Sequence, residues 1–273
     1  GITTSVGKTM TENGTATWAG NISGAGNVAT TGTGNWTITT AQSYTGTTAV
    51  GAGTTLTLST TDNEISSSSA VAVTGTLNMT GTNQTLNVLS GTGGITTSVG
   101  KTMTENGTAS WGGVIGGAGN VATAGTGTWT LTGANIYTGT TTIGSGTTLS
   151  IAGQNNLSGT SGIAMNSGTL QLTGDTTITK TVALTGTNTI NVGANTDNFS
   201  NVVSGTGNLV VAASGGTLGF TNTNTYSGTT TINSGATLGL VTGNDTIATS
   251  STVTNNGTIN MTGTSQTLKN LSG

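Results

Sequence analysis

The feature that most constrains this chain is an internal repeat with an offset of 93 residues. Residues 1–20 read GITTSVGKTMTENGTATWAG, and residues 94–113 read GITTSVGKTMTENGTASWGG. A third, more diverged copy ends the chain, where GTINMTGTSQTLKNLSG at 257–273 matches GTLNMTGTNQTLNVLSG at 75–91. A chain that repeats itself throughout is expected to fold as a stack of similar units, because each unit buries its apolar side against its neighbours.

The copies divide the 273 residues into three modules of about 91 residues, at 1–93, 94–182 and 183–273. We expect the modules to form one continuous stack rather than three separate domains. Neither end of the chain carries the atypical polar unit with which repeat arrays protect an open edge. We therefore expect the chain to be a length of a longer array, or its ends to meet other copies.

Within each module, apolar residues alternate with polar ones in short bursts. Trp129 and Leu131 form one burst, and Leu149 and Ile151 form another. Alternation with a period of two is the pattern of a β-strand that is buried on one side. Gly, Asn and Ser separate the bursts and favour bends, and the abundant Thr and Val favour extended backbone. The sequence predicts many short strands joined by tight corners.

Two architectures fit short strands with corner glycines: an antiparallel sandwich or barrel, and a parallel β-solenoid. The solenoid is favoured because most turns read GxG or TGT rather than the Asn-Gly of hairpins, because near-identical modules extend a stack without interruption, and because only 3% of residues are aromatic. We predict an all-β, right-handed parallel β-helix built from the three tandem modules. Its coils should use about 18 to 24 residues each, which gives roughly 12 to 15 coils.

Composition excludes several classes of function. The chain has no Cys, no His and only four basic residues, all of them Lys, in 273 residues. Without a clustered basic stripe, nucleic acid is not an expected partner, and no apolar run is long enough for a membrane-spanning helix. Without His and Cys, Ser-His-Asp and Cys-His catalysis and the usual zinc sites are excluded. We predict no catalytic, cofactor-binding or metal-binding residues, and no enzymatic activity.

Acidic and aromatic residues are the remaining candidates for a site. Converging carboxylates would suggest glycosidase chemistry or a calcium site, but only two acids are close in sequence, and we expect all of them at the solvated surface: Glu12, Asp62, Glu64, Glu105, Asp175, Asp197 and Asp245. Aromatic side chains could stack on sugars. Because each occupies a fixed phase of the repeat, we expect core or corner positions instead for Trp18, Trp36, Trp111, Trp129, Tyr44, Tyr137 and Tyr226.

One phrase occurs once per module: QSYTGTTAVGAGTTL at 42–56, NIYTGTTTIGSGTTL at 135–149 and NTYSGTTTINSGATL at 224–238. With the preceding G-x-G-x-[WL]-x-[LIF], it resembles the passenger-associated repeat of bacterial autotransporter (type V secretion) proteins. In the second module the resemblance is carried by Gly127, Trp129, Leu131, Asn135, Tyr137, Gly139, Thr140, Thr142, Ile143, Gly146 and Leu149. It implies a right-handed β-helical passenger held outside the cell. The family's membrane barrel and N-terminal effector domain are not in this sequence.

From the repeats and the resemblance we expect a structural protein, namely an extracellular fibre or adhesin stalk at a bacterial cell surface that forms filaments or takes part in biofilm. The expected partners are other copies of the chain and surface glycans. The alternative is a carbohydrate-binding or catalytic autotransporter passenger. An ice-binding threonine array is disfavoured because TTT clusters recur once per module rather than once per coil.

Overall fold

The structure is a computed structural model that describes residues 1–273. The chain is all-β, with parallel strands stacked as a β-solenoid of about 13 turns. Residues pair with others about one turn away, such as Ile2 with Ile22 and Val28 with Thr48. The predicted fold class is thus confirmed, and these 20-residue coils fall within the predicted range. The one regular helix is the short 3-10 helix η1 (Gln154–Leu157).

No helix has the length and apolar character needed to cross a membrane.

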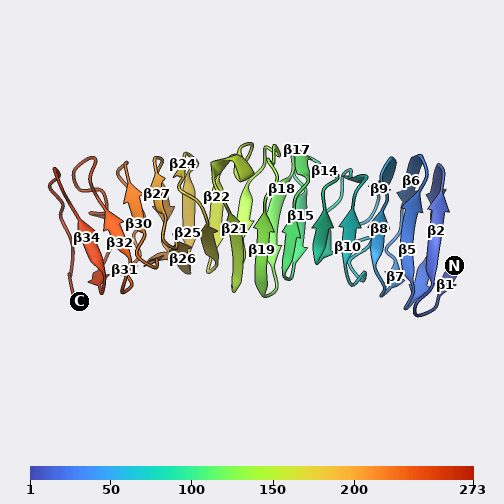
Figure 1. Cartoon of the computed structure of the whole chain (residues 1–273), viewed down its shortest axis with the longest axis horizontal. Helices are drawn as coiled ribbons and strands as arrows, with labels where there is room; N and C mark the ends of the chain where they lie inside the picture. Colours follow the sequence, from blue (N-terminus) through green and yellow to red (C-terminus); the bar gives the residue numbers. More distant parts are fainter. The chain divides into compact units, whose positions relative to one another are not determined.

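The chain forms two compact units. The first comprises residues 1–124 and 129–139, and the second comprises residues 125–128 and 140–273. Within each unit, a turn contributes up to three strands, and the equivalent strands of successive turns lie side by side (Figure 1). Each unit therefore has three faces.

In the first unit, the three faces are formed by the following strands. The first face contains β2 (Thr9–Asn13), β5 (Asn27–Thr31), β8 (Thr48–Val50), β10 (Val71–Val73), β13 (Leu89–Gly91), β16 (Ala109–Trp111) and β19 (Gly127–Leu131). The second face contains β3 (Ala16–Trp18), β6 (Gly34–Ile38), β9 (Thr54–Leu58), β11 (Thr76–Met79), β14 (Gly94–Thr97) and β17 (Val114–Gly117). The third face contains two sheets, which are separated by the turn at residues 61–70. One consists of β1 (Ile2–Thr4), β4 (Ile22–Gly24) and β7 (Ser43–Tyr44), and the other begins with β12 (Gln84–Asn87), β15 (Thr102–Asn106) and β18 (Asn120–Ala124).

The second unit repeats this arrangement. One face contains β21 (Thr147–Ile151), β23 (Thr169–Leu172), β26 (Thr187–Asn191), β29 (Asn208–Ala212), β31 (Thr230–Ile232) and β33 (Val253–Asn255). Another contains β24 (Thr177–Ile178), β27 (Thr196–Phe199), β30 (Thr217–Phe220), β32 (Thr237–Gly239) and β34 (Thr258–Asn260). The last contains β20 (Thr141–Ile143), β22 (Ile163–Asn166), β25 (Val182–Thr185) and β28 (Val203–Gly205).

Inward side chains stack into apolar ladders that form the core. On the second face of the first unit, successive turns place buried side chains in register: Trp36, Leu56, Leu77, Ile95 and Ile115. Burial of an aliphatic side chain of this size stabilises a fold by about 1.5 to 3 kcal/mol. Because each ladder continues from turn to turn, the narrow core is held together along its length and needs no ion pairs.

Near-identical strands of the first two modules occupy different faces of the first unit. The sequence TMTEN forms β2 on the first face and β15 on the third face. Likewise, β3 lies on the second face, whereas its copy β16 lies on the first. β15 is the thirteenth strand after β2, and the turn at residues 61–70 occupies one further position between β7 and β12. One module therefore advances the chain by fourteen strand positions. Because each turn of the solenoid has three such positions, one on each face, the module is four and two-thirds turns long.

The three faces accept the same strands because all of them need the same alternation of inward apolar and outward polar side chains. The two copies differ in the strands that lie beside them. β2 pairs with β5, whereas β15 lies between β12 and β18. Met103 in β15 is accordingly fully buried, and the equivalent Met10 in β2 is half-exposed.

Candidate functional site

The phrase that recurs once per module is a buried structural element. Its first residue, Asn or Gln, and the Tyr two positions later are both buried, as Asn224 and Tyr226 show in the third copy. Gly235 bends the chain with a φ of 82°, and Ile232 and Leu238 are fully buried in the core. The amide and the tyrosine of the motif therefore face inward, whereas polar residues between them, such as Thr225 and Ser227, are exposed.

The Asn or Gln of this motif holds two turns together. The side-chain oxygen of Asn224 accepts a hydrogen bond from the backbone N–H of Val203, at 2.8 Å. Gln42 and Asn135 accept equivalent bonds from Ile22 and Ile115, at 2.7 and 2.8 Å. We call such a side chain an amide clamp. Six positions make this bond to a residue about 20 positions earlier: Gln42, Gln84, Asn135, Asn188, Asn224 and Gln266.

The other end of each amide clamp is also bonded. The NH2 group of Asn224 donates to the carbonyl oxygen of Asn222 at 3.2 Å, and that of Asn188 donates to Thr185 at 3.1 Å. An amide suits this position because it carries an acceptor and a donor on one planar group. Both halves of a clamp are thus satisfied within the interior, where an unpaired polar group would be costly.

The tyrosine of the motif starts a chain of buried hydroxyl groups. In the first copy, the Tyr44 hydroxyl bonds the Thr48 hydroxyl at 2.5 Å, and Thr48 donates to Ser68 at 2.9 Å. In the third copy, Tyr226 bonds Thr230 at 2.6 Å, and Thr230 bonds Ser250 at 2.9 Å. Burial raises the pKa of Tyr44 to about 12. These hydroxyls are consequently neutral structural groups.

The GAGN element that precedes the motif makes a close approach between turns. Gly24 and its copy Gly117 have φ angles of 93° and 92°. A Cβ atom at either position would overlap the carbonyl oxygen of Thr4 or Thr97 on the neighbouring turn. This Gly-rich string is a turn between two strands, and glycine is required because a side chain would separate the neighbouring coils.

The expectation that all acids are solvated is wrong for three of them. Glu64, Glu105 and Asp197 are each fully buried. In TMTEN at 102–106, Glu105 has the same inward phase as Met103. That alternation is the signal that could have identified Glu105 as an inward residue. The other expectation, that the aromatic residues lie in the core, is confirmed for Trp36, Trp111, Trp129 and all three tyrosines, while Trp18 is half-exposed.

Glu105 and Asp197 occupy positions of the amide-clamp type. Both oxygens of Glu105 lie near the backbone N–H of Leu89, at 3.3 and 3.2 Å, and one oxygen of Asp197 accepts a bond from Thr176 at 2.9 Å. Burial raises the pKa of Glu105 to about 7. Burial, with a smaller contribution from the nearby Asp175, raises the pKa of Asp197 to about 6. The second oxygen of Asp197 is buried without a hydrogen-bond partner.

The two acids that are close in sequence do not converge. Asp62 is exposed and accepts bonds from the backbone and side chain of Asn83, which lower its pKa. Glu64 points inward, where it accepts the N–H groups of Thr60 and Thr61, and burial raises its pKa. No group of three acidic side chains lies close enough to hold a metal ion. The carboxylates serve local backbone contacts instead.

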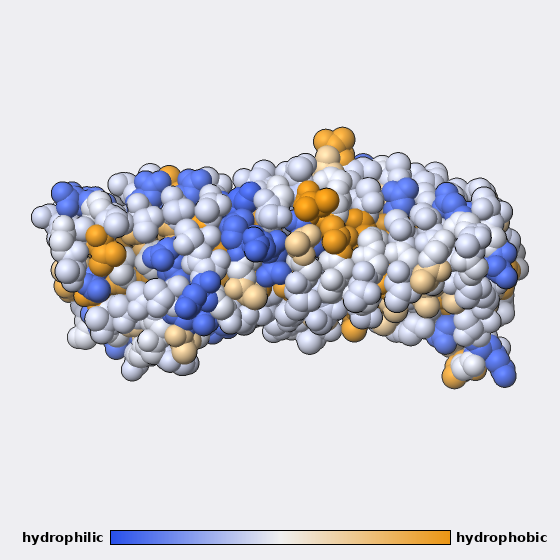
Figure 2. Space-filling view, turned by 45° about the horizontal axis from the view of Figure 1, so that its top comes forward, coloured by the Kyte–Doolittle hydropathy of each residue, from blue (hydrophilic) through white to orange (hydrophobic).

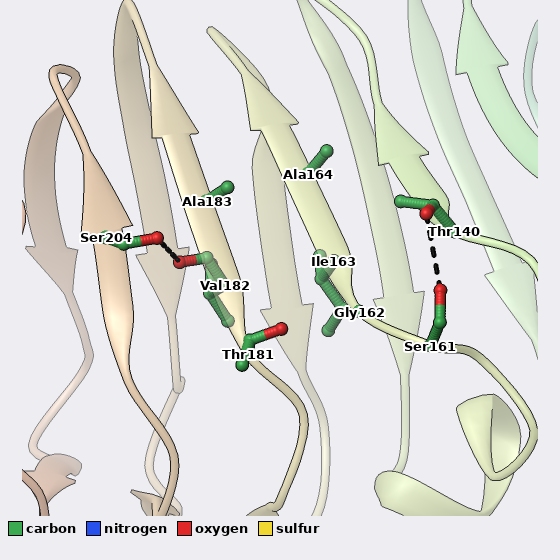
Figure 3. A pocket seen from close by; sticks show the side chains of 9 residues that line it. All are labelled: Thr140, Ser161, Gly162, Ile163, Ala164, Thr181, Val182, Ala183 and Ser204. Atoms are coloured by element: carbon green, nitrogen blue, oxygen red, sulfur yellow. Dashed lines mark hydrogen bonds between the residues drawn. The ribbon is translucent and has the colours of Figure 1, made fainter.

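An open groove lies on the second unit (Figure 3). Ala164, Ala183 and Ser204 lie in register on β22, β25 and β28. Thr181 flanks this row, and hydroxyl groups at Thr140 and Ser161 bond each other across neighbouring turns at 3.3 Å. The outward side chains of this row are all small. Its lining offers hydroxyl groups and methyl groups, and no titratable group.

The exposed surface is mostly weakly polar. Figure 2 shows a face of pale side chains with scattered hydrophilic and hydrophobic groups. The most exposed large apolar side chains are Val6 and Val99, at 79% and 78% exposure. They occupy the same place in the copied sequence TSVGK of the first two modules. Because those modules are rotated by a third of a turn, the two loops leave the first unit at corners that join different pairs of faces.

Comparison with known proteins gives no significant match to this chain among family models, curated proteins or solved structures.

Proposed function

We propose that this chain is a structural segment of an extracellular fibre or adhesin stalk at a bacterial cell surface. The observation that carries the proposal is that the amide and the tyrosine of the recurring motif are buried and contribute to contacts between turns. The amide accepts a hydrogen bond from the preceding turn, and the tyrosine begins a chain of hydroxyl groups that reaches the next turn. A protein whose most distinctive repeated residues are internal is suited to extending a stack. The resemblance of the motif to autotransporter passenger repeats supports secretion and display outside the cell.

Other copies of the chain are the partners that this function requires. The chain has few charges, with seven acidic and four basic residues. Electrostatic repulsion between two copies is therefore weak and does not oppose their contact. We propose lateral or end-to-end association into filaments, as in a biofilm matrix.

Electron microscopy of the purified chain tests this function. Filaments or bundles of solenoids with a spacing of about 4.8 Å along the axis are expected, because that is the spacing of hydrogen-bonded strands. Isolated particles at all concentrations, combined with tight binding of a soluble ligand, would contradict it.

Resistance to trypsin is a second test. Trypsin requires Lys or Arg, and Lys8, Lys101, Lys180 and Lys269 are the available residues. Complete cleavage after these four residues gives peptides of 8, 93, 79, 89 and 4 residues, so the readout is whether the intact chain survives. We expect the folded chain to remain uncut at Lys101 and Lys180 under conditions that cleave the urea-unfolded chain completely, as measured by mass spectrometry. Equally fast cleavage of the folded and the unfolded chain would contradict a stalk that must survive outside the cell.

Carbohydrate binding is the second candidate, and the groove of Figure 3 favours it. Hydroxyl and methyl groups in a row can contact the two sides of a sugar ring. Binding on a glycan array that is lost in Ala183→Gln, which would fill the groove, and kept in Ala72→Gln, an exposed alanine on β10 of the other unit, would support it.

A further inference from the structure

The buried carboxyl groups of Glu105 and Asp197 differ chemically from the amide clamps whose positions they take. At six positions an amide accepts an N–H bond with its oxygen and donates to a nearby carbonyl with its NH2 group. At Asp197 the second oxygen replaces that NH2 group. An ionised carboxylate has no donor, whereas a protonated carboxyl group has one O–H. The protonated form therefore carries the same combination of one acceptor and one donor as an amide. The N–H bonds of Leu89 and Thr176 favour the ionised form, but burial outweighs them and favours the protonated form.

No positive charge is placed to stabilise the ionised forms. The strands beside Glu105, which are β12 and β18, contain no titratable residue, and neither do β13, β14, β16 and β17 of the surrounding turns. For Asp197, the neighbouring β24 and β30 also contain none. The charged group that acts on Asp197 is Asp175, which repels a second negative charge. Lys180, which follows β24, directs its ammonium group to the exposed carbonyl of Ser158 at 2.9 Å.

We propose that Glu105 and Asp197 are pH-sensitive clamps, which hold adjacent turns together when protonated and loosen them when ionised. One clamp lies in each unit, and each acts on a defined backbone contact, at Leu89 and at Thr176. The solenoid is tightest in acid, and it loosens locally at these two places as the pH rises. This inference concerns the cohesion of the fold and does not depend on the proposed fibre.

The sign and the pH window follow from the raised pKa values. Both groups are neutral in the folded and unfolded chain at low pH. As the pH rises from 4.5 to about 7, Glu105 ionises more readily in the unfolded chain, and the same holds for Asp197 from 3.8 to about 6. The contribution of these two groups to the free energy of unfolding is therefore largest below these pH windows and falls as the pH rises through them. Above the windows it does not change further.

Hydrogen exchange of the intact chain at about pH 4 and pH 8, corrected for the intrinsic pH dependence, tests the proposal. Between these pH values we expect opening at the Leu89 and Thr176 amides to increase by about a hundredfold, since each unit of pKa shift corresponds to a factor of ten. Glu105→Gln should abolish the increase at Leu89 only, and Asp197→Asn should abolish it at Thr176 only.

Two further variants serve as matched controls. Asn224→Asp should create a new pH-dependent opening at Val203, the N–H that Asn224 binds. Asp62→Asn removes an exposed carboxylate and should leave both clamps unchanged. Should any variant fail to fold, infrared spectroscopy of the wild-type chain at about pH 5 must still show protonated buried carboxyl groups. Exchange that is independent of pH at both amides, an unchanged pH dependence in the isosteric variants, or the absence of that infrared signal would overturn the proposal.

Discussion

At some positions of this solenoid, the close distance between neighbouring turns restricts which residue can be accommodated. The two copies of GAGN show this clearly, because Gly117 combines a φ of 92° with a Cβ position that overlaps the Thr97 carbonyl oxygen. Gly100, in the TSVGK loop, has a φ of 71° but no atom within 4 Å of its Cβ position. The first glycine is required by backbone conformation and by space, and the second by conformation alone.

Substitution of these two glycines separates the two requirements. Gly117→Ala should lower the free energy of unfolding by more than about 3 kcal/mol, because strain of about 1–2 kcal/mol at positive φ adds to a clash with rigid backbone. Gly100→Ala should cost about 1 kcal/mol, from conformation alone. Urea denaturation followed by circular dichroism measures both, and equal losses would refute the close approach at Gly117.

At the scale of elements, cohesion depends on contacts that cross from one turn to the next. A strand is paired along its length, but the corner before it contains N–H groups that no ladder satisfies. The amide clamps supply acceptors at those corners, as Asn224 does for Val203 at the start of β28. The hydroxyl chain from Tyr226 through Thr230 to Ser250 joins the next pair of turns in a similar way.

Removal of one clamp should loosen one corner. Asn224→Ala leaves the buried N–H of Val203 without its partner, which should cost about 1–3 kcal/mol. The loss should be local, so hydrogen exchange should accelerate in β28 and much less in β23, five strands earlier in the chain. Thr223→Ala, at an exposed neighbouring position, is the control and should leave exchange in β28 unchanged. Uniform acceleration over the whole second unit would contradict a corner-specific role.

At the scale of the whole molecule, the repeat and the turn have different lengths. A module of 93 residues advances the chain by four and two-thirds turns, so that successive copies use different faces. The fold tolerates this because a strand on any of the three faces needs the same alternation of inward apolar and outward polar side chains. Repeat number is then free to change without regard to whole turns.

An in-phase deletion tests this equivalence. Removal of residues 20–112, which is one module length, joins Ala19 to Gly113 and moves every later strand of the first unit by one face. We expect the shortened chain to fold, with an unchanged circular dichroism spectrum per residue and a smaller denaturant dependence that reflects fewer turns. Removal of residues 20–107 joins β3 almost directly to β16 without a corner, and it should disrupt folding. If both deletions behave alike, phase within the module does not matter.

The prediction from sequence succeeded where local pattern is sufficient. Alternation marked Trp129, Leu131, Leu149 and Ile151 as inward, and all four are buried. It failed for Glu64, Glu105 and Asp197, which were expected at the solvated surface and are buried. Their burial depends on the turns above and below them, as the half-exposed Glu12, the copy of Glu105 in β2, demonstrates.

By itself, the sequence determined the parallel solenoid, the approximate length of its coils and the side chains that form its core. Each of these follows from alternation and corner glycines within a short stretch of chain. Only the tertiary structure decided which face a given strand occupies and which acids lose contact with water. The face depends on the summed length of all preceding coils, including the turn at residues 61–70, and burial depends on the neighbouring turn about 20 residues away. Neither is a property of the strand's own residues.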